Sequence, residues 1–71
     1  MSNKGVPLNR VKELREAQGM TQFQLSIRSE VAQSAISLVE NFKISPYPRW
    51  REAIAKALGV EESEVFPDPE G

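Results

Sequence analysis

A short stretch near the middle of the chain, VAQSAISLVEN at residues 31–41, carries polar side chains of an unusual kind. They are amides and hydroxyls without formal charge, namely Gln33, Ser34, Ser37 and Asn41. Such groups donate and accept hydrogen bonds, whereas the solvated face of a helix usually carries charged residues. At about 100° per residue, all four fall within about 100° of one another on a helix, and most of the apolar residues fall on the other side. The stretch therefore predicts a two-faced helix with an uncharged hydrogen-bonding surface.

The residues on which most enzymes and metal sites depend are missing from the sequence. There is no histidine, which is the commonest general base and a common metal ligand, and there is no cysteine for a thiolate site or a disulfide. Most acidic residues fall in the last part of the chain and form no nucleophile–base or paired-carboxylate arrangement. We therefore expect a protein that is not an enzyme and that uses no metal or other cofactor.

Charge is distributed unevenly along the 71 residues. Residues 1–51 hold eight basic and four acidic side chains, whereas residues 52–71 hold one lysine and six acidic side chains. This asymmetry suggests one face for a polyanion and another kept away from it, with a chance division in a short chain as the alternative. No apolar run approaches the roughly 20 residues that cross a bilayer, so we expect a cytoplasmic protein.

Hydrophobic spacing and helix-end signals predict five short helices in one compact all-α domain and no strand. The expected helices cover about 8–18, 22–29, 32–40, 48–58 and 61–66. Residues 1–7 are expected to form a flexible arm, residues 8–67 the domain, and residues 68–71 an acidic tail. A core of this size gives limited stability, so self-association is expected.

The helix boundaries rest on a few residues. Gly19 suits a left-handed C-cap, and Thr21 followed by Gln24 has the spacing of a capping box. Helix 22–29 should then turn Leu25 and Ser29 inward. The next connection contains no Gly, Pro or Asn, so we expect Glu30 to adopt a left-handed conformation there at a cost of about 1 kcal/mol.

Helices 22–29 and 32–40, joined by a tight turn, predict a helix-turn-helix at about 21–40. In such a unit the second helix enters the major groove of DNA. Gln matches adenine with two hydrogen bonds, Ser bonds to several bases, and small side chains allow close approach. The face formed by Gln33, Ser34 and Ser37 fits that role.

The same residues resemble a known family. The chain reads T-Q-x-x-L-x(5)-V-x-Q-S-x-I-S-x-V-E-N from Thr21 to Asn41, with RVKELR at 10–15 and IAKALGV at 54–60. This pattern is similar to the Cro/C1-type helix-turn-helix family, also called XRE, which includes phage repressors and many small bacterial regulators. The resemblance covers about 9–67 and implies a five-helix, lambda-repressor-like domain.

The resemblance also implies roles for individual residues. Gln33 would contact a base, and Ser34 and Ser37 would face bases or nearby phosphates. Gln22 would bond to a phosphate and brace Gln33. The remaining residues expected to bind the DNA backbone or to begin the helix-turn-helix are Arg10, Thr21, Asn41, Lys43 and Arg49.

Each role has a plainer alternative. Thr21 and Gln22 would otherwise simply begin a helix, Ser34 and Ser37 would act as passive spacers, and the basic residues would be solvated charges. Two family positions suggest a structural role instead, because Arg15 and Glu40 would form a partly buried ion pair between the first and third helices. Trp50 is expected to pack on the core.

Several positions depart from the family pattern. Glu30 and Phe42 stand where glycine is usual, Ala32 replaces a capping residue, and Leu38 replaces a residue that is often basic. A missing cap costs roughly 0.5–2 kcal/mol. We therefore expect these changes to alter the turn geometry and to weaken the affinity for DNA.

The resemblance implies a sequence-specific regulator of transcription that binds double-stranded DNA, most simply a repressor on a two-fold operator. A homodimer would form through the C-terminal helices, with Val60, Val65 and Phe66 as the contact. The alternative is a protein-interaction module of the same fold, such as an antitoxin that grips a protein partner, which an apolar patch formed by Leu38 and Phe42 would support.

Overall fold

The computed structural model describes residues 9–67, and within this range it contains five α-helices and no strand. The helices are α1 (Val11–Ala17), α2 (Gln22–Ser29), α3 (Gln33–Glu40), α4 (Pro48–Leu58) and α5 (Glu62–Val65). The prediction of an all-α, five-helix domain is confirmed. The predicted arm at 1–7 and tail at 68–71 lie outside the described residues.

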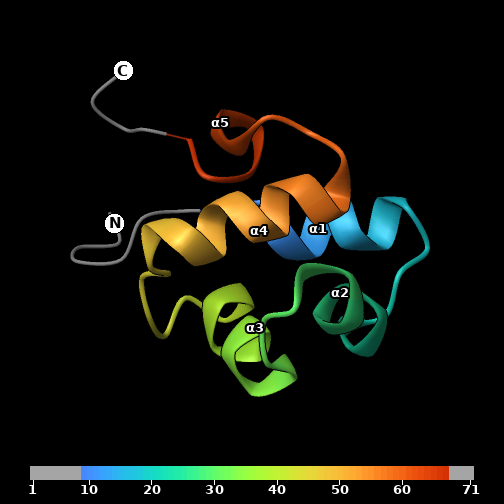
Figure 1. Ribbon diagram of the computed structural model, residues 1–71, viewed down its shortest axis with the longest axis horizontal. Helices are drawn as coiled ribbons and strands as arrows, with labels where there is room; N and C mark the ends of the chain where they lie inside the picture. The colour runs from blue at the N-terminus through green and yellow to red at the C-terminus, as the bar shows by residue number, and fades with distance from the viewer. Residues whose placement is uncertain (1–8, 68–71) are drawn as a thin grey trace.

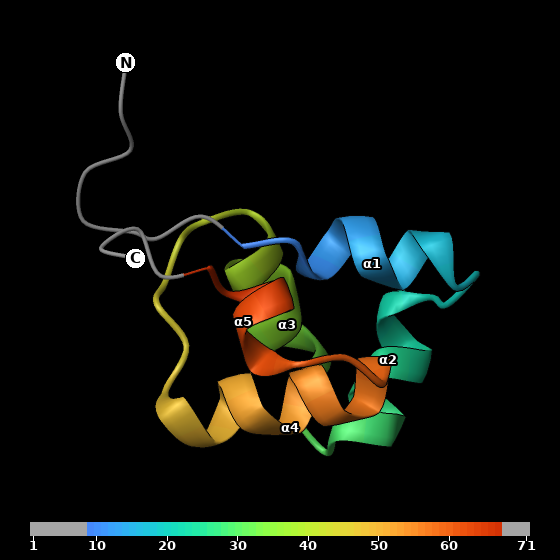
Figure 2. The ribbon, with the colours of Figure 1, turned by 90° about the horizontal axis from the view of Figure 1, so that it is seen from above.

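The five helices pack around a common core and do not form layers. Figure 1 shows α4 across the middle, with α2 and α3 on one side of it and α5 on the other. Figure 2, seen from above, shows α1 and α4 on opposite sides of the molecule with α2 at one end. Helix α3 therefore lies away from α5 at the edge of the domain. No helix among the described residues is long and apolar enough to span a membrane.

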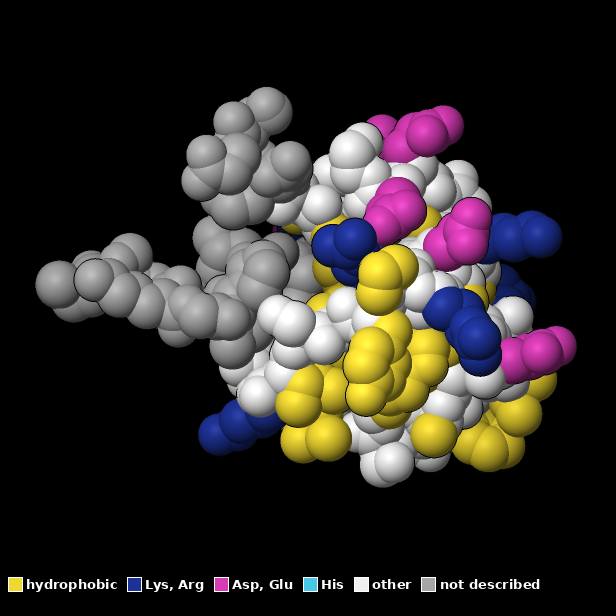
Figure 3. All heavy atoms as spheres, turned by 60° about the vertical axis from the view of Figure 1, so that its left-hand side comes forward, with side chains coloured by type: hydrophobic (Ala, Val, Ile, Leu, Met, Phe, Trp, Pro, Cys, Tyr) yellow, Lys and Arg dark blue, Asp and Glu magenta, His cyan; other side chains and the backbone are white. Residues whose placement is uncertain are grey.

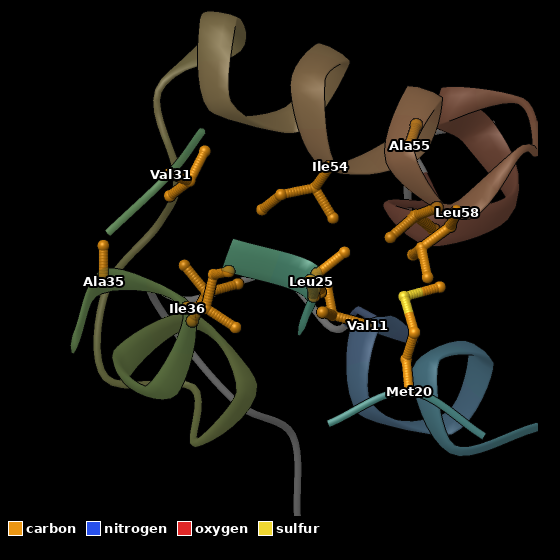
Figure 4. Close-up of a cluster of buried hydrophobic side chains, with 11 residues drawn as sticks. Val11, Met20, Leu25, Val31, Ala35, Ile36, Ile54, Ala55 and Leu58 are labelled. Carbon is orange, nitrogen blue, oxygen red and sulfur yellow. The ribbon is translucent and has the colours of Figure 1, made fainter. Parts of the chain in front are cut away.

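The core lies where α1, α2, α3 and α4 meet (Figure 4). Leu25 from α2, Ile36 from α3 and Ile54 from α4 are fully buried and point toward one another. The other buried hydrophobic residues are Val11, Met20, Val31, Ala35, Val39, Ala55, Leu58 and Val65. Because every long element contributes to this single cluster, the position of α3 is fixed by the same contacts that stabilise the domain.

Helix α2 begins and ends as its residues predict. The Thr21 hydroxyl accepts a hydrogen bond from the Gln24 backbone N–H at 3.0 Å, and the Gln24 side chain accepts one from the Thr21 N–H at 3.0 Å. This confirms the capping box. Leu25 and Ser29 are both buried, as expected. Gly19, which follows the C-cap residue Gln18 of α1, has a φ of +69°, which confirms its left-handed conformation.

The turn between α2 and α3 is held by two serines rather than by a glycine. The Ser26 hydroxyl donates to the Val31 carbonyl at 2.7 Å, and the Ser29 hydroxyl accepts from the Val31 N–H at 3.2 Å. Glu30 between them has a φ of +62°, which confirms the predicted left-handed residue. Two side-chain bonds to one buried residue thus fix the angle between the two helices.

The starts of three helices differ from the predicted ranges, and α5 begins at Glu62 rather than at residue 61. Helix α1 begins at Val11 rather than at residue 8, and the Asn9 side chain accepts a hydrogen bond from the Val11 N–H at the start of the helix. Helix α3 begins at Gln33, with Ala32 as an N-cap residue that offers no side-chain bond. The predicted absence of a cap at Ala32 is thereby confirmed.

We expect Glu30→Gly to stabilise the protein. Glycine adopts a positive φ without the steric cost that other residues meet, about 1–2 kcal/mol, although it also gives the unfolded chain more freedom. The net gain should be up to about 1 kcal/mol, which raises Tm by roughly 4–8 °C in a domain of this size. Thermal unfolding monitored by circular dichroism checks this.

The matched control is Arg28→Gly, which places glycine at an exposed position inside α2. It should destabilise the protein by about 1 kcal/mol, because glycine is a poor helix former. If Glu30→Gly lowered Tm as much as this control does, the left-handed conformation would not be a source of strain.

Candidate nucleic-acid interface

Helix α3 presents the uncharged polar face that its sequence predicts. Ala35, Ile36 and Val39 are buried against the core, while Gln33 and Ser34 are exposed and Ser37 is half-buried. The three predicted base-contacting residues therefore lie together on the solvent side of one rigid helix. Among the described residues, neither Gln33 nor Ser34 makes a side-chain hydrogen bond, so their polar atoms remain available to a ligand.

A buried ion pair ties α3 to α1. Arg15 Nε lies 2.7 Å from Glu40 Oε2, and Arg15 Nη2 lies 3.2 Å from Glu40 Oε1. Only 10% of the arginine side chain and 2% of the glutamate side chain are exposed. Arg15 also donates from Nη1 to the Met20 carbonyl at 2.7 Å, and its bonds to Glu40 raise the pKa of the guanidinium. The predicted structural pair is confirmed.

Gln22 adds α2 to this network. Its Nε2 donates to Glu40 Oε1 at 2.9 Å, so Glu40 on α3 is bound from both α1 and α2. The expectation that Gln22 braces Gln33 is not met, because the Gln22 amide is directed to the buried carboxylate instead. One N–H of the Gln22 amide is used in this bond, and the second makes no hydrogen bond among the described residues.

Two more of the predicted DNA-binding residues, Asn41 and Lys43, lie just after the end of α3. Asn41 Nδ2 donates to the Ser37 carbonyl at 2.8 Å and lies 3.5 Å from Ser37 Oγ, so the amide adds a second hydrogen bond to a carbonyl that already accepts the Asn41 backbone N–H at 3.0 Å. Lys43 is exposed, and its backbone N–H donates to the Leu38 carbonyl at 2.8 Å. Phe42 between them has a φ of +58°, which is costly for a bulky residue.

Arg10 lies apart from the α3 residues. Its backbone N–H donates to the Val65 carbonyl at 2.8 Å, and its guanidinium pairs with Glu13 at 3.0 Å. The hydrogen bond from Arg10 lowers the pKa of the Glu13 carboxyl, so this exposed pair is charged on both sides at neutral pH. Among the described residues, no hydrogen bond or ion pair joins Arg10 to α3.

Two predicted residues lie at helix starts. Thr21 is exposed as the N-cap of α2, where its hydroxyl oxygen accepts the capping bond and its O–H stays free to donate. Arg49 is exposed in the first turn of α4. Beside it, Trp50 packs partly against the core, as predicted, and its ring meets Tyr47 edge-on with centroids 4.9 Å apart.

The acidic part of the chain lies on the side opposite α3. Glu61, Glu62 and Glu64 belong to α5 and its N-cap, which Figure 1 places across α4 from α2 and α3. In the face shown in Figure 3, most acidic side chains gather in the upper half, on the side of α5. The acidic residues of α5 are therefore separated in space from α3, whereas Glu13 and Glu16 of α1 lie nearer, around the same cavity as Asn41 and Phe42.

Two residues have roles that the sequence did not reveal. Asn9 donates from Nδ2 to the Val39 carbonyl at 3.0 Å, which ties the start of α1 to α3. The sequence signal that could have indicated this role is an asparagine just before a helical pattern. Leu38 falls within the apolar half predicted for α3, but 44% of it is exposed, because Ala35, Ile36 and Val39 already fill the core side.

One predicted dimer contact is wrong. Val65 has 0% of its surface exposed and belongs to the core, so it has no surface to offer a second chain. Val60 and Phe66 are partly buried and pack against that core from outside.

Among the described residues there is also no group of acidic side chains arranged to hold a metal ion.

The fold and the site together define a helix-turn-helix domain. Helix α2 and helix α3 are joined by a short left-handed turn, α3 exposes an uncharged polar face, and a buried three-residue network fixes α3 against its neighbours. This combination of a rigid scaffold and an exposed reading surface is what a groove-binding helix requires.

Comparison with known proteins agrees. Residues 9–65 match the family described as "Helix-turn-helix domain". The chain is 37% identical over 71 residues to the HTH-type transcriptional regulators PuuR of Escherichia coli and of Shigella flexneri. These matches cover 99% of the chain but 38% of each relative's length. The crystal structure of the restriction-modification controller protein C.AhdI from Aeromonas hydrophila superposes with a TM-score of 0.77 at 32% identity, covering 80% of this chain and 86% of that one.

The chain therefore belongs to the helix-turn-helix domain family, and within it to the Cro/C1-type. The resemblance read from the motif is confirmed.

Proposed function

We propose that this chain is a sequence-specific DNA-binding regulator of transcription that inserts α3 into the major groove of double-stranded DNA. The observation that carries the proposal is the exposed face of Gln33, Ser34 and Ser37 on a helix held by the buried network of Arg15 and Glu40. The names of the relatives, a transcriptional regulator and a controller protein, support the same function.

In this proposal, the base contacts come from α3. Gln33 lies at the first position of the helix, where residues of a recognition helix reach base edges, and its amide matches adenine N6 and N7. Ser34 and Ser37 are small enough to let the helix approach closely, and their hydroxyls donate or accept at neighbouring bases. Because the backbone of α3 is fixed before binding, little ordering cost is added.

The phosphate contacts come from residues around α3. Gln22 and Thr21 at the start of α2 each keep one donor, and Asn41 and Lys43 follow the end of α3. Arg49 at the start of α4 and Arg10 at the start of α1 would extend the contact, with Arg10 first exchanging its bond to Glu13. Contacts of this kind set the position of the protein without reading sequence.

We further propose that two chains bind a two-fold operator and repress by occupying it. One small domain covers limited DNA surface, and two half-sites about one helical turn apart multiply the specificity. The surface for self-association would be Val60 and Phe66 with the end of α4, since these residues are only partly buried. A cytoplasmic location and the absence of enzymatic activity accompany this function.

The test of DNA binding is a titration with duplex DNA at two salt concentrations. The affinity should fall steeply as salt rises, because each neutralised phosphate releases a counterion. A labelled random-sequence duplex serves as the reference for nonspecific binding. Absence of binding at low salt would reject the proposal.

We expect Lys43→Ala to weaken binding to specific and random DNA alike, and to reduce the salt slope by about one. The reason is that Lys43 would neutralise a phosphate without touching a base. Lys56→Ala is the matched control, because Lys56 is exposed on α4 within the acidic segment, and it should leave binding unchanged. Equal effects of the two substitutions would show that Lys43 acts only through net charge.

A second function is supported by exposed apolar side chains. Phe23 and Ile27 on α2 are 61% and 62% exposed, and Leu38 and Phe42 are exposed near the end of α3. Such side chains would suit an antitoxin-like module that grips a protein partner. The salt titration separates the two functions, since a module that acts only on protein would bind no DNA.

A further inference from the structure

We infer that Leu38 is a specificity-determining residue that contacts the C5-methyl group of a thymine in the major groove. This inference rests on the proposed binding of DNA by α3 and adds a type of contact that the polar residues cannot make. Leu38 is 44% exposed, whereas its neighbours Ile36 and Val39 are fully buried. Its side chain is therefore presented to solvent rather than used by the core.

The position of Leu38 on the helix places it beside the polar face. On a helical wheel with about 100° per residue, Leu38 lies roughly 40° beyond Ser34. Along the chain, Ser37 directly precedes Leu38 and Asn41 follows it by about one turn. Leu38 is thus the apolar member of a surface that is otherwise made of amides and hydroxyls. With α3 in the major groove as proposed, Leu38 would face the groove beside Ser34, roughly 140° around the helix from Gln33.

The chemistry of the groove explains why an apolar residue belongs there. Thymine alone presents a methyl group in the major groove, and apolar side chains recognise it by contact. The hydrogen-bonding residues on α3 distinguish donors from acceptors and do not bury that methyl. Leu38 would bury it, and so would separate thymine from the unmethylated pyrimidine cytosine.

Phe42, the other exposed apolar residue near the end of α3, lines a surface that does not include Leu38. Phe42 stands one turn away, but its left-handed backbone takes it out of the helix, and it lines a cavity of about 560 Å³ with Lys12, Glu13 and Glu16 of α1. Leu38 does not line that cavity. Because Leu38 instead adjoins Ser34, Ser37 and Asn41 along the helix, contact with DNA fits it better than contact with an apolar protein surface.

The geometry also limits where the thymine lies. Leu38 lies five positions after Gln33, which is about 7.5 Å along the helix axis and roughly two base steps. The thymine is therefore expected within about two base pairs of the adenine that Gln33 reads.

The test begins with a binding site selected from random duplex DNA, in which each thymine is then replaced in turn by uracil. Uracil lacks only the methyl group. At one thymine in each half-site, wild-type protein should lose about three- to fivefold in affinity, as expected for one buried methyl. Leu38→Ala should bind the uracil and thymine versions of that site equally.

Ile27→Ala is the matched control, because Ile27 is also an exposed apolar residue but lies on α2. It should keep the full preference for thymine. A melting curve of Leu38→Ala close to that of the wild type shows that the fold is retained. The inference is overturned, while the proposed function stands, if Leu38→Ala still prefers thymine over uracil at every position where the wild type does, or if the wild type shows no such preference. If selection yields no site, the proposed function itself fails.

Discussion

Replacing Arg15 by alanine is expected to destabilise the protein by about 3–5 kcal/mol, because it leaves Glu40 charged and buried without its main partner. The Glu40 side chain is only 2% exposed and receives two of its hydrogen bonds from Arg15. Domains of this size have a free energy of unfolding of only several kcal/mol, so the loss should remove most of it. Urea unfolding followed by circular dichroism measures this change.

Two variants make this prediction specific. Arg51→Ala removes a comparable pair, in which Arg51 Nε lies 3.2 Å from Glu62 Oε2, but both side chains are about 40% exposed. That loss should cost less than about 1 kcal/mol. Arg15→Met combined with Glu40→Met should recover part of the stability, because no charge is then left buried without a partner. Equal losses in Arg15→Ala and Arg51→Ala would show that burial of the first pair does not matter.

Gln33→Ala is expected to lower specific affinity for the operator by about 1–3 kcal/mol and to relax the preference at one base pair. Binding to random DNA should change little, because Gln33 carries no charge to attract phosphates. Titration of the variant against the selected site and against random duplex DNA measures both quantities.

The same experiment on modified DNA shows which base is read. Replacing the adenine at that position by 7-deazaadenine removes the N7 acceptor, so the wild-type protein should lose affinity while Gln33→Ala loses little more. The two changes should therefore be non-additive. Additive losses would place Gln33 away from that adenine.

The helix-turn-helix was the most predictable part of the fold, because local chemistry decides it. The capping box of Thr21 and Gln24 defines the start of α2, and the missing turn residue before Val31 required Glu30 to be left-handed. The pair of Arg15 and Glu40 came from the family resemblance and not from spacing, since the two residues are 25 positions apart.

The features that the sequence did not decide or predicted wrongly depend on tertiary contacts. For Leu38 the sequence left open both burial in the apolar half of α3 and a place in an exposed patch; the core is already filled by its neighbours, so the side chain is exposed. Val65 was expected at a dimer surface, yet the packing of α5 on α4 buries it. Gln22 turned to Glu40 rather than to Gln33, which only the relative placement of α2 and α3 determines.

The central claim is that α3 reads DNA sequence, and selection of bound duplexes from a random library with purified protein tests it most directly. We expect enrichment of a two-fold symmetric site whose half-sites are about one helical turn apart. The same selection with Gln33→Ala should lose the preference at one position in each half-site. Recovery of DNA with no enriched sequence, or of the same site with full preference by Gln33→Ala, would contradict the claim.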